Sequence, residues 1–149
     1  MRKITTLIAL TLMPLQASLA QKAVKWGPAP AVFPAGAKMA VMQGDPSSGN
    51  LFTVRLEMPN GYRIAPHFHP TDEHITVISG DFLVGMGDKM DTKGAMSLKS
   101  GGFATAPAQQ HHWGIARGRT IVQVHAVGPF QLTYVNPADD PSKKGVAKK

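Results

Sequence analysis

Alternating apolar and polar side chains are the dominant pattern of this chain. Across residues 51–58 every second position is apolar, from Phe52 to Met58, and polar or charged side chains stand between them. A period of two is typical of a strand with one buried and one exposed face. Residues 51–58 are therefore predicted to form a half-buried β-strand.

Shorter runs of the same kind recur along the chain, and no stretch has a sustained helical period. Turn-forming residues separate the runs, as in Ser79-Gly80-Asp81, which is predicted to be a turn. About nine or ten short strands without helices between them indicate an all-β protein, an antiparallel sandwich or barrel. The predicted strands are 39–42, 51–58, 73–78, 82–86, 95–98, 103–106, 112–116, 120–127 and 130–135.

The N-terminus has the three parts of a secretory signal peptide. Two basic residues precede an apolar run from Ile4 to Leu15, and the small side chains of Ser18 and Ala20 precede an expected cleavage site. The apolar run is too short to span a bilayer. We therefore expect residues 1–20 to be removed on export, and the protein to be periplasmic or secreted, with no permanent membrane span.

The rest of the chain divides into an arm, one domain and a tail. Four breaks containing glycine or proline within residues 21–37 predict an extended N-terminal arm. The strand pattern occupies residues 38–136, which predicts a single barrel domain. Residues 137–149 end in lysines and predict a disordered basic tail.

The net charge of +7 at pH 7 suggests at first a polyanionic partner. Two of the positive charges belong to the signal peptide and four to the tail, so the body of the protein is nearly neutral. Nucleic-acid binding is therefore not expected. The chain has no cysteine, which excludes disulfides, thiolate catalysis, iron–sulfur clusters and Cys-ligated zinc.

Histidines and a glutamate gather near the ends of predicted strands. His67 and His69 are two residues apart, so an extended backbone points both imidazoles to one face, and the flanking prolines exclude a regular helix. Glu73 opens the next predicted strand, and the pair His111-His112 follows much later. Three imidazoles and one carboxylate around one interior would form a site for a divalent first-row metal ion: Fe, Mn, Ni, Zn or Cu.

Five residues between 61 and 80 have a characteristic spacing: Gly61, His67, His69, Glu73 and Gly80. This spacing resembles the first motif of the cupin superfamily, with every fixed position present. The resemblance implies a cupin-type double-stranded β-helix, or jelly-roll barrel, with the metal inside one mouth of the barrel. It also implies that the two histidines and the glutamate are metal ligands.

The second cupin motif is met in part, by Gly101, Pro107 and His112. Gln109 stands where the motif has glycine, and Ala116 where it has asparagine. If the turn requires a left-handed backbone at position 109, glutamine costs about 1 to 2 kcal/mol relative to glycine. Neighbouring residues of a strand face opposite sides, so only one of the two adjacent histidines is a ligand, and the spacing from Pro107 selects His112 rather than His111.

The resemblance implies an exported metal-binding cupin and leaves the reaction open. Three histidines and one glutamate leave coordination positions free. We therefore expect a metal-dependent enzyme, a dioxygenase-like oxidoreductase or a related cupin enzyme, acting on a small, anionic, oxygen-bearing metabolite. The alternative is a non-catalytic cupin that binds or senses a metal or ligand, and a homodimer is expected from family analogy only.

Further side chains are candidates for the wall of the metal cavity, where they would contact a substrate. His125 and Gln123 share one face of a predicted strand, Arg63 could bind a carboxylate, and two aromatic residues flank the second motif. The five candidates are His125, Gln123, Arg63, Trp113 and Phe103.

Overall fold

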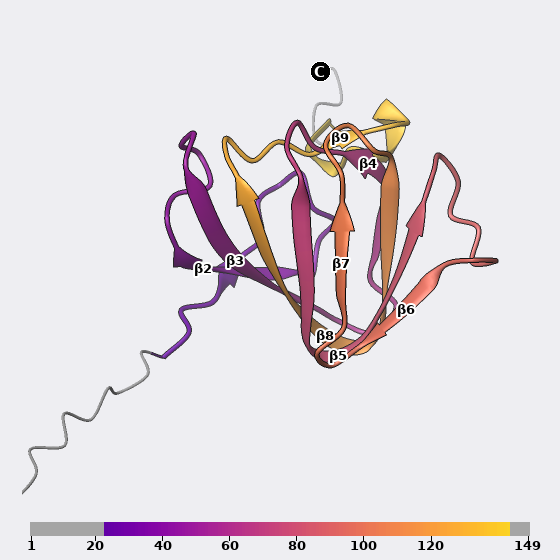
Figure 1. Ribbon diagram of the computed structural model, residues 1–149, viewed down its shortest axis with the longest axis horizontal. Helices are drawn as coiled ribbons and strands as arrows, with labels where there is room; N and C mark the ends of the chain where they lie inside the picture. The colour runs from indigo at the N-terminus through magenta and orange to yellow at the C-terminus, as the bar shows by residue number, and fades with distance from the viewer. Residues whose placement is uncertain (1–22, 144–149) are drawn as a thin grey trace, which may run out of the picture.

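Strands build most of residues 23–143, the part of the chain that the computed structural model describes (Figure 1). The expected signal peptide and residues 144–149 of the expected tail lie outside this part. Within it, no helix is long and apolar enough to cross a membrane. The strands are β1 (Gly27–Pro28), β2 (Lys38–Gln43), β3 (Leu51–Met58), β4 (Arg63–Phe68), β5 (Glu73–Met86), β6 (Met96–Lys99), β7 (Phe103–Ala106), β8 (His112–Val127) and β9 (Thr133–Tyr134).

Two long antiparallel strands, β5 and β8, pair along almost their whole length and connect the two walls of the barrel. The first half of β5 pairs with β7 and its second half with β6. The first half of β8 pairs with β4 and its second half with β3. Strands β2 and β1 extend the sheet beyond β3, and β9 extends it beyond β4, so the sheet curls around one interior.

The continuity of β5 differs from the prediction of two strands separated by a turn. The register against β8 shifts between Val77 and Ser79 and again between Ser79 and Asp81, and Gly80 has φ +91°. An extra residue in a bulge bends a strand without ending it. The predicted strands 112–116 and 120–127 join in the same way, and Gly118 in β8 has φ +81°.

The interior is filled by the apolar faces of the strands. Phe52, Val54, Leu56 and Met58 of β3 are all buried, so the strand and the face predicted for residues 51–58 are confirmed. In β5 the side chains that belong to the core cluster change from odd to even positions across the bulge, from Val77 to Phe82 and Val84.

The described segments before and after the barrel are more ordered than the extended arm and the disordered tail that the sequence predicts. Phe33, in the loop after β1, is buried in the core, and the hydroxyls of Tyr62 and Tyr134 donate hydrogen bonds to main-chain oxygens of this loop. Residues 137–143, expected within a disordered tail, form two short 3-10 helices, η1 (Pro137–Asp139) and η2 (Pro141–Lys143).

Candidate metal centre

Four strand-end side chains meet inside one end of the barrel. His67 lies in β4 and His69 directly after it, while Glu73 and His112 are the first residues of β5 and β8. His67 and His112 are paired across the antiparallel strands. All four side chains are buried, and their candidate ligand atoms lie within 4.8 Å of one another.

The main chain fixes the orientation of each imidazole. The Nδ1 atoms of His67, His69 and His112 lie 2.7, 2.6 and 2.9 Å from the carbonyl oxygens of residues 65, 131 and 110. A carbonyl oxygen only accepts, so each Nδ1 carries a proton and donates. Each ring, when neutral, then has its lone pair on Nε2, which is the form that binds a metal.

The carboxylate of Glu73 lies among these nitrogens. Its Oε2 is 3.2 Å from Nε2 of His112 and 3.5 Å from Nε2 of His69. Within residues 23–143, Nε2 of His69 is a buried atom with no hydrogen-bond partner. Lone pairs facing a carboxylate are unfavourable unless a proton or a cation lies between them, so this set of residues fits a metal ion.

The surroundings of the cluster keep His67 neutral and Glu73 charged, which are the forms that bind a metal. Burial and the neighbouring imidazoles of His112 and His69 lower the pKa of His67 to about 3. Burial raises the pKa of Glu73, but the hydrogen bond from His112 and the surrounding imidazoles outweigh it and lower the pKa to about 2. Burial lowers the pKa of His112, and the contact with Glu73 outweighs burial and raises it. At neutral pH the carboxylate is charged and His67 is neutral.

The turn before β8 decides between the two adjacent histidines. Gln109 adopts the left-handed backbone with φ +63°, and its N–H donates to the carbonyl of His69 over 2.8 Å. His112 then faces the cluster. His111 faces outward, where its ring stacks on Phe68 and its Nδ1 lies 2.5 Å from a carboxylate oxygen of Asp88.

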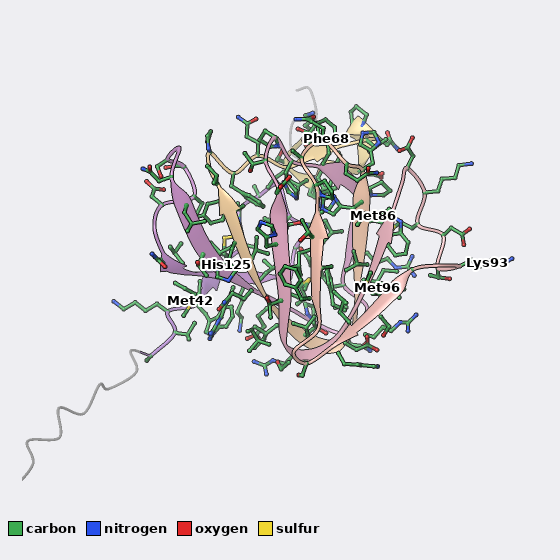
Figure 2. The ribbon with its side chains drawn as sticks, viewed as in Figure 1. Met42, Phe68, Met86, Lys93, Met96 and His125 are labelled. Atoms are coloured by element: carbon green, nitrogen blue, oxygen red, sulfur yellow. The ribbon has the colours of Figure 1, made fainter. Side chains whose placement is uncertain are left out.

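Of the five predicted cavity-wall residues, only Trp113 lies at the cavity wall. His125 and Gln123 alternate with the inward-facing Val122 and Val124 of β8, so they lie on the outer surface, where His125 contacts Thr53 over 2.9 Å (Figure 2). Arg63 and Phe103, also predicted at the cavity wall, are exposed on the surface. Strand alternation accounts for all four errors.

The segment 128–132 contributes to the site, a role that no pattern in the sequence indicates. The ring of Phe130 stacks on His69 with centroids 4.8 Å apart, and the carbonyl of Gln131 accepts from His69. The region was predicted to be a strand over 130–135, but only Thr133–Tyr134 is a strand. No local pattern could identify these contacts, because they join residues about sixty positions apart.

Comparison with known proteins supports the fold. Residues 15–133 match the family described as Domain of unknown function (DUF4437). No curated protein matches the chain.

Solved structures of the same fold share little sequence with the chain. The polyketide cyclase RemF from Streptomyces resistomycificus has a TM-score of 0.64 at 18% identity, over 80% of this chain and 85% of that one. A proposed acetylacetone dioxygenase from Methylibium petroleiphilum PM1 has a TM-score of 0.60 at 20% identity, over 93% and 90%. An RmlC-like cupin from Shewanella frigidimarina NCIMB 400 has a TM-score of 0.56 at 14% identity, over 71% and 86%. These likenesses confirm the predicted cupin jelly-roll barrel.

Proposed function

The chain belongs to the cupin-like family DUF4437, and from this premise we propose that it is an exported metal-dependent enzyme acting on a small oxygen-bearing molecule. The observation that carries the proposal is the buried group of His67, His69, Glu73 and His112 with its ligand atoms within 4.8 Å of one another. The orphaned Nε2 of His69 supports a metal as the missing partner.

The cluster supplies the ligand types and the charge that a divalent first-row ion requires. Three neutral imidazoles and one carboxylate leave a net charge of about +1 on the loaded site, which attracts an anionic head group. Main-chain carbonyls hold the imidazole rings in place. When bound, such a metal supplies Lewis acidity and, if it is Fe, Mn or Cu, redox chemistry.

We favour dioxygenase-like oxidation within this proposal. Four protein ligands leave coordination positions free for a substrate head and for O₂. The apolar surroundings of the site exclude water, which strengthens the attraction between a metal and an anionic head. The fold likeness to a proposed dioxygenase over 93% of this chain is consistent with that choice.

Metal analysis of the protein tests the proposal. The full chain, produced with export to a bacterial periplasm, should contain about one first-row metal ion per chain, and Glu73→Gln should contain much less. His74→Ala is the matched control, because His74 is the next residue of β5 and lies on the outer surface with Thr105. Absence of metal in the wild type overturns the proposal. Bound metal without O₂ uptake or turnover on a panel of small oxygenated compounds favours a binding or sensing cupin.

A further inference from the structure

One wall of the cavity is apolar along its depth below the ligand cluster. Glu73 stands at one end of this wall. Glu73 is paired with Ala126 of β8. Two residues further along β8, Val124 is paired with Val54 of β3, and after two more residues Val122 is paired with Leu56. These four apolar side chains line the cavity. Four strand residues extend about 13 Å, so a molecule bound at the cluster meets only apolar side chains on this wall.

The facing wall has the same character. Gly114 lies two residues beyond His112, paired with Ile64 of β4 and Val84 of β5. The ring of Phe82 covers this glycine, since a Cβ there would lie 2.3 Å from its Cζ. Ile64, Val84 and Phe82 all line the cavity.

Within residues 23–143, the ionisable side chains that line the cavity all belong to the ligand cluster. Among the described residues, no lysine, arginine or aspartate and no side-chain amide or hydroxyl lines it apart from that end. Arg63 is exposed, and Arg55 lies on the outer face, where it donates to Gln123 over 2.9 Å. A second charged group on a bound molecule would have no partner and would lose its hydration.

The cavity is also narrow. The space between its walls is about 520 Å³ when the solvent-filled opening is included. The cavity volume proper is only about 30 Å³, which is room for about two or three water molecules. A slim molecule of few atoms fits this space, and a sugar or a branched polyol does not.

We propose that the substrate is a slim molecule with a single oxygen-bearing head for the metal cluster and an uncharged, apolar remainder that lies between the two walls. This inference rests on the proposed function, because the head group binds the metal. It narrows the substrate class to compounds that carry their only charge at the end that the metal binds.

A series of hydroxamic acids tests this inference with the full chain loaded with Co(II), whose visible absorption reports binding without turnover. From acetohydroxamic to butyrohydroxamic acid, affinity should rise about fourfold for each added methylene. Succinic monohydroxamic acid has nearly the shape of 4-methylpentanohydroxamic acid but ends in a carboxylate, and it should bind at least about tenfold more weakly. Val124→Ala should extend the chain length that is tolerated, and Val127→Ala, at an exposed position of the same strand, should not.

The outcomes separate the two proposals. If Co(II) does not bind, the proposed function fails and this inference fails with it. If Co(II) binds but affinity does not depend on chain length, or if the carboxylate-ended compound binds as tightly as its apolar counterpart, this inference alone is overturned. The wild-type series decides the matter even if Val124→Ala does not fold.

Discussion

Histidines lie in equal number on the inner and outer faces of the barrel wall, but their surroundings differ. The chain has six histidines, and three lie on each face. The inner rings are 3 to 4% exposed and belong to the ligand cluster, while the outer rings are partly exposed. The inner set is His67, His69 and His112, and the outer set is His74, His111 and His125.

The hydrogen-bond partners distinguish the two sets further. Each inner ring bonds a main-chain carbonyl, whereas each outer ring bonds a side chain, namely Thr105, Asp88 or Thr53. A carbonyl fixes the tautomer because it only accepts, and so does the carboxylate of Asp88 beside the exposed His111, but the hydroxyls of Thr105 and Thr53 donate or accept and leave the tautomer free. Burial together with a main-chain acceptor is therefore what separates a candidate ligand from a surface histidine.

The largest expected difference between the faces is in metal affinity. His67→Ala should weaken the binding of Zn(II) or Co(II) by more than about 100-fold, because loss of a group that only orients a ligand already costs about 10- to 100-fold. His125→Ala on the outer face should leave the affinity unchanged. Competition with a chromophoric chelator measures both values, and similar losses in the two variants would contradict the distinction between the faces.

The second-largest expected difference between the inner and outer histidines is in how strongly they make the metal-free protein sensitive to acid. Burial and the imidazoles of His112 and His69 lower the pKa of His67 from 6.5 to about 3. Between pH 6.5 and about 4.5 the unfolded chain therefore binds a proton that the folded state excludes, and the free energy of unfolding should fall by about 2 to 3 kcal/mol. His69, whose pKa burial also lowers, acts in the same direction, while His112, whose pKa the contact with Glu73 raises, acts in the opposite direction and offsets part of the loss.

Urea unfolding at pH 7 and pH 4.5, with a chelator present, measures this loss. His67→Gln should lose clearly less stability on acidification than the wild type, and His125→Gln should lose as much as the wild type. The explanation is wrong if His67→Gln keeps the full loss.

The smallest expected effect concerns a single methyl group. Gly114→Ala places a Cβ 2.3 Å from the ring of Phe82 on the inner face, and overpacking of this kind costs about 1 to 3 kcal/mol. At Gly49, on the surface, a Cβ meets nothing within 4 Å, so Gly49→Ala should change stability by less than about 0.5 kcal/mol. Chemical denaturation compares the two variants, and equal stabilities would show that Phe82 moves aside freely.

Three of the four residues of the candidate site could be predicted well because their information is local. His67, His69 and Glu73 lie within seven residues, and strand alternation with a short turn brings them together whatever the rest of the chain does. The alternation over residues 51–58 is local in the same sense, and its strand and buried face are confirmed.

The cavity wall could not be predicted in the same way. Which side chains face inward along β5 depends on a bulge near Gly80, and the bulge is visible only in the pairing with β8. Pattern alone treated residues 79–81 as a turn. His125 was placed in the cavity because its residue type suits a site, whereas pairing with β3 puts it opposite Thr53 on the outer surface.

The sequence by itself determined that this protein is all-β, that its motif resembles that of the cupin barrels, and which local group of histidines and glutamate could hold a metal. Period and spacing carry this information because they act over a few residues of backbone. Only the tertiary structure decided that Phe33 lines the cavity, that Phe130 stacks on His69 and Gln131 orients it, and that the walls below the cluster are apolar and closely spaced. These features depend on contacts between residues far apart in the chain, and such contacts exist only once the sheet has curled and β5 and β8 have found their register.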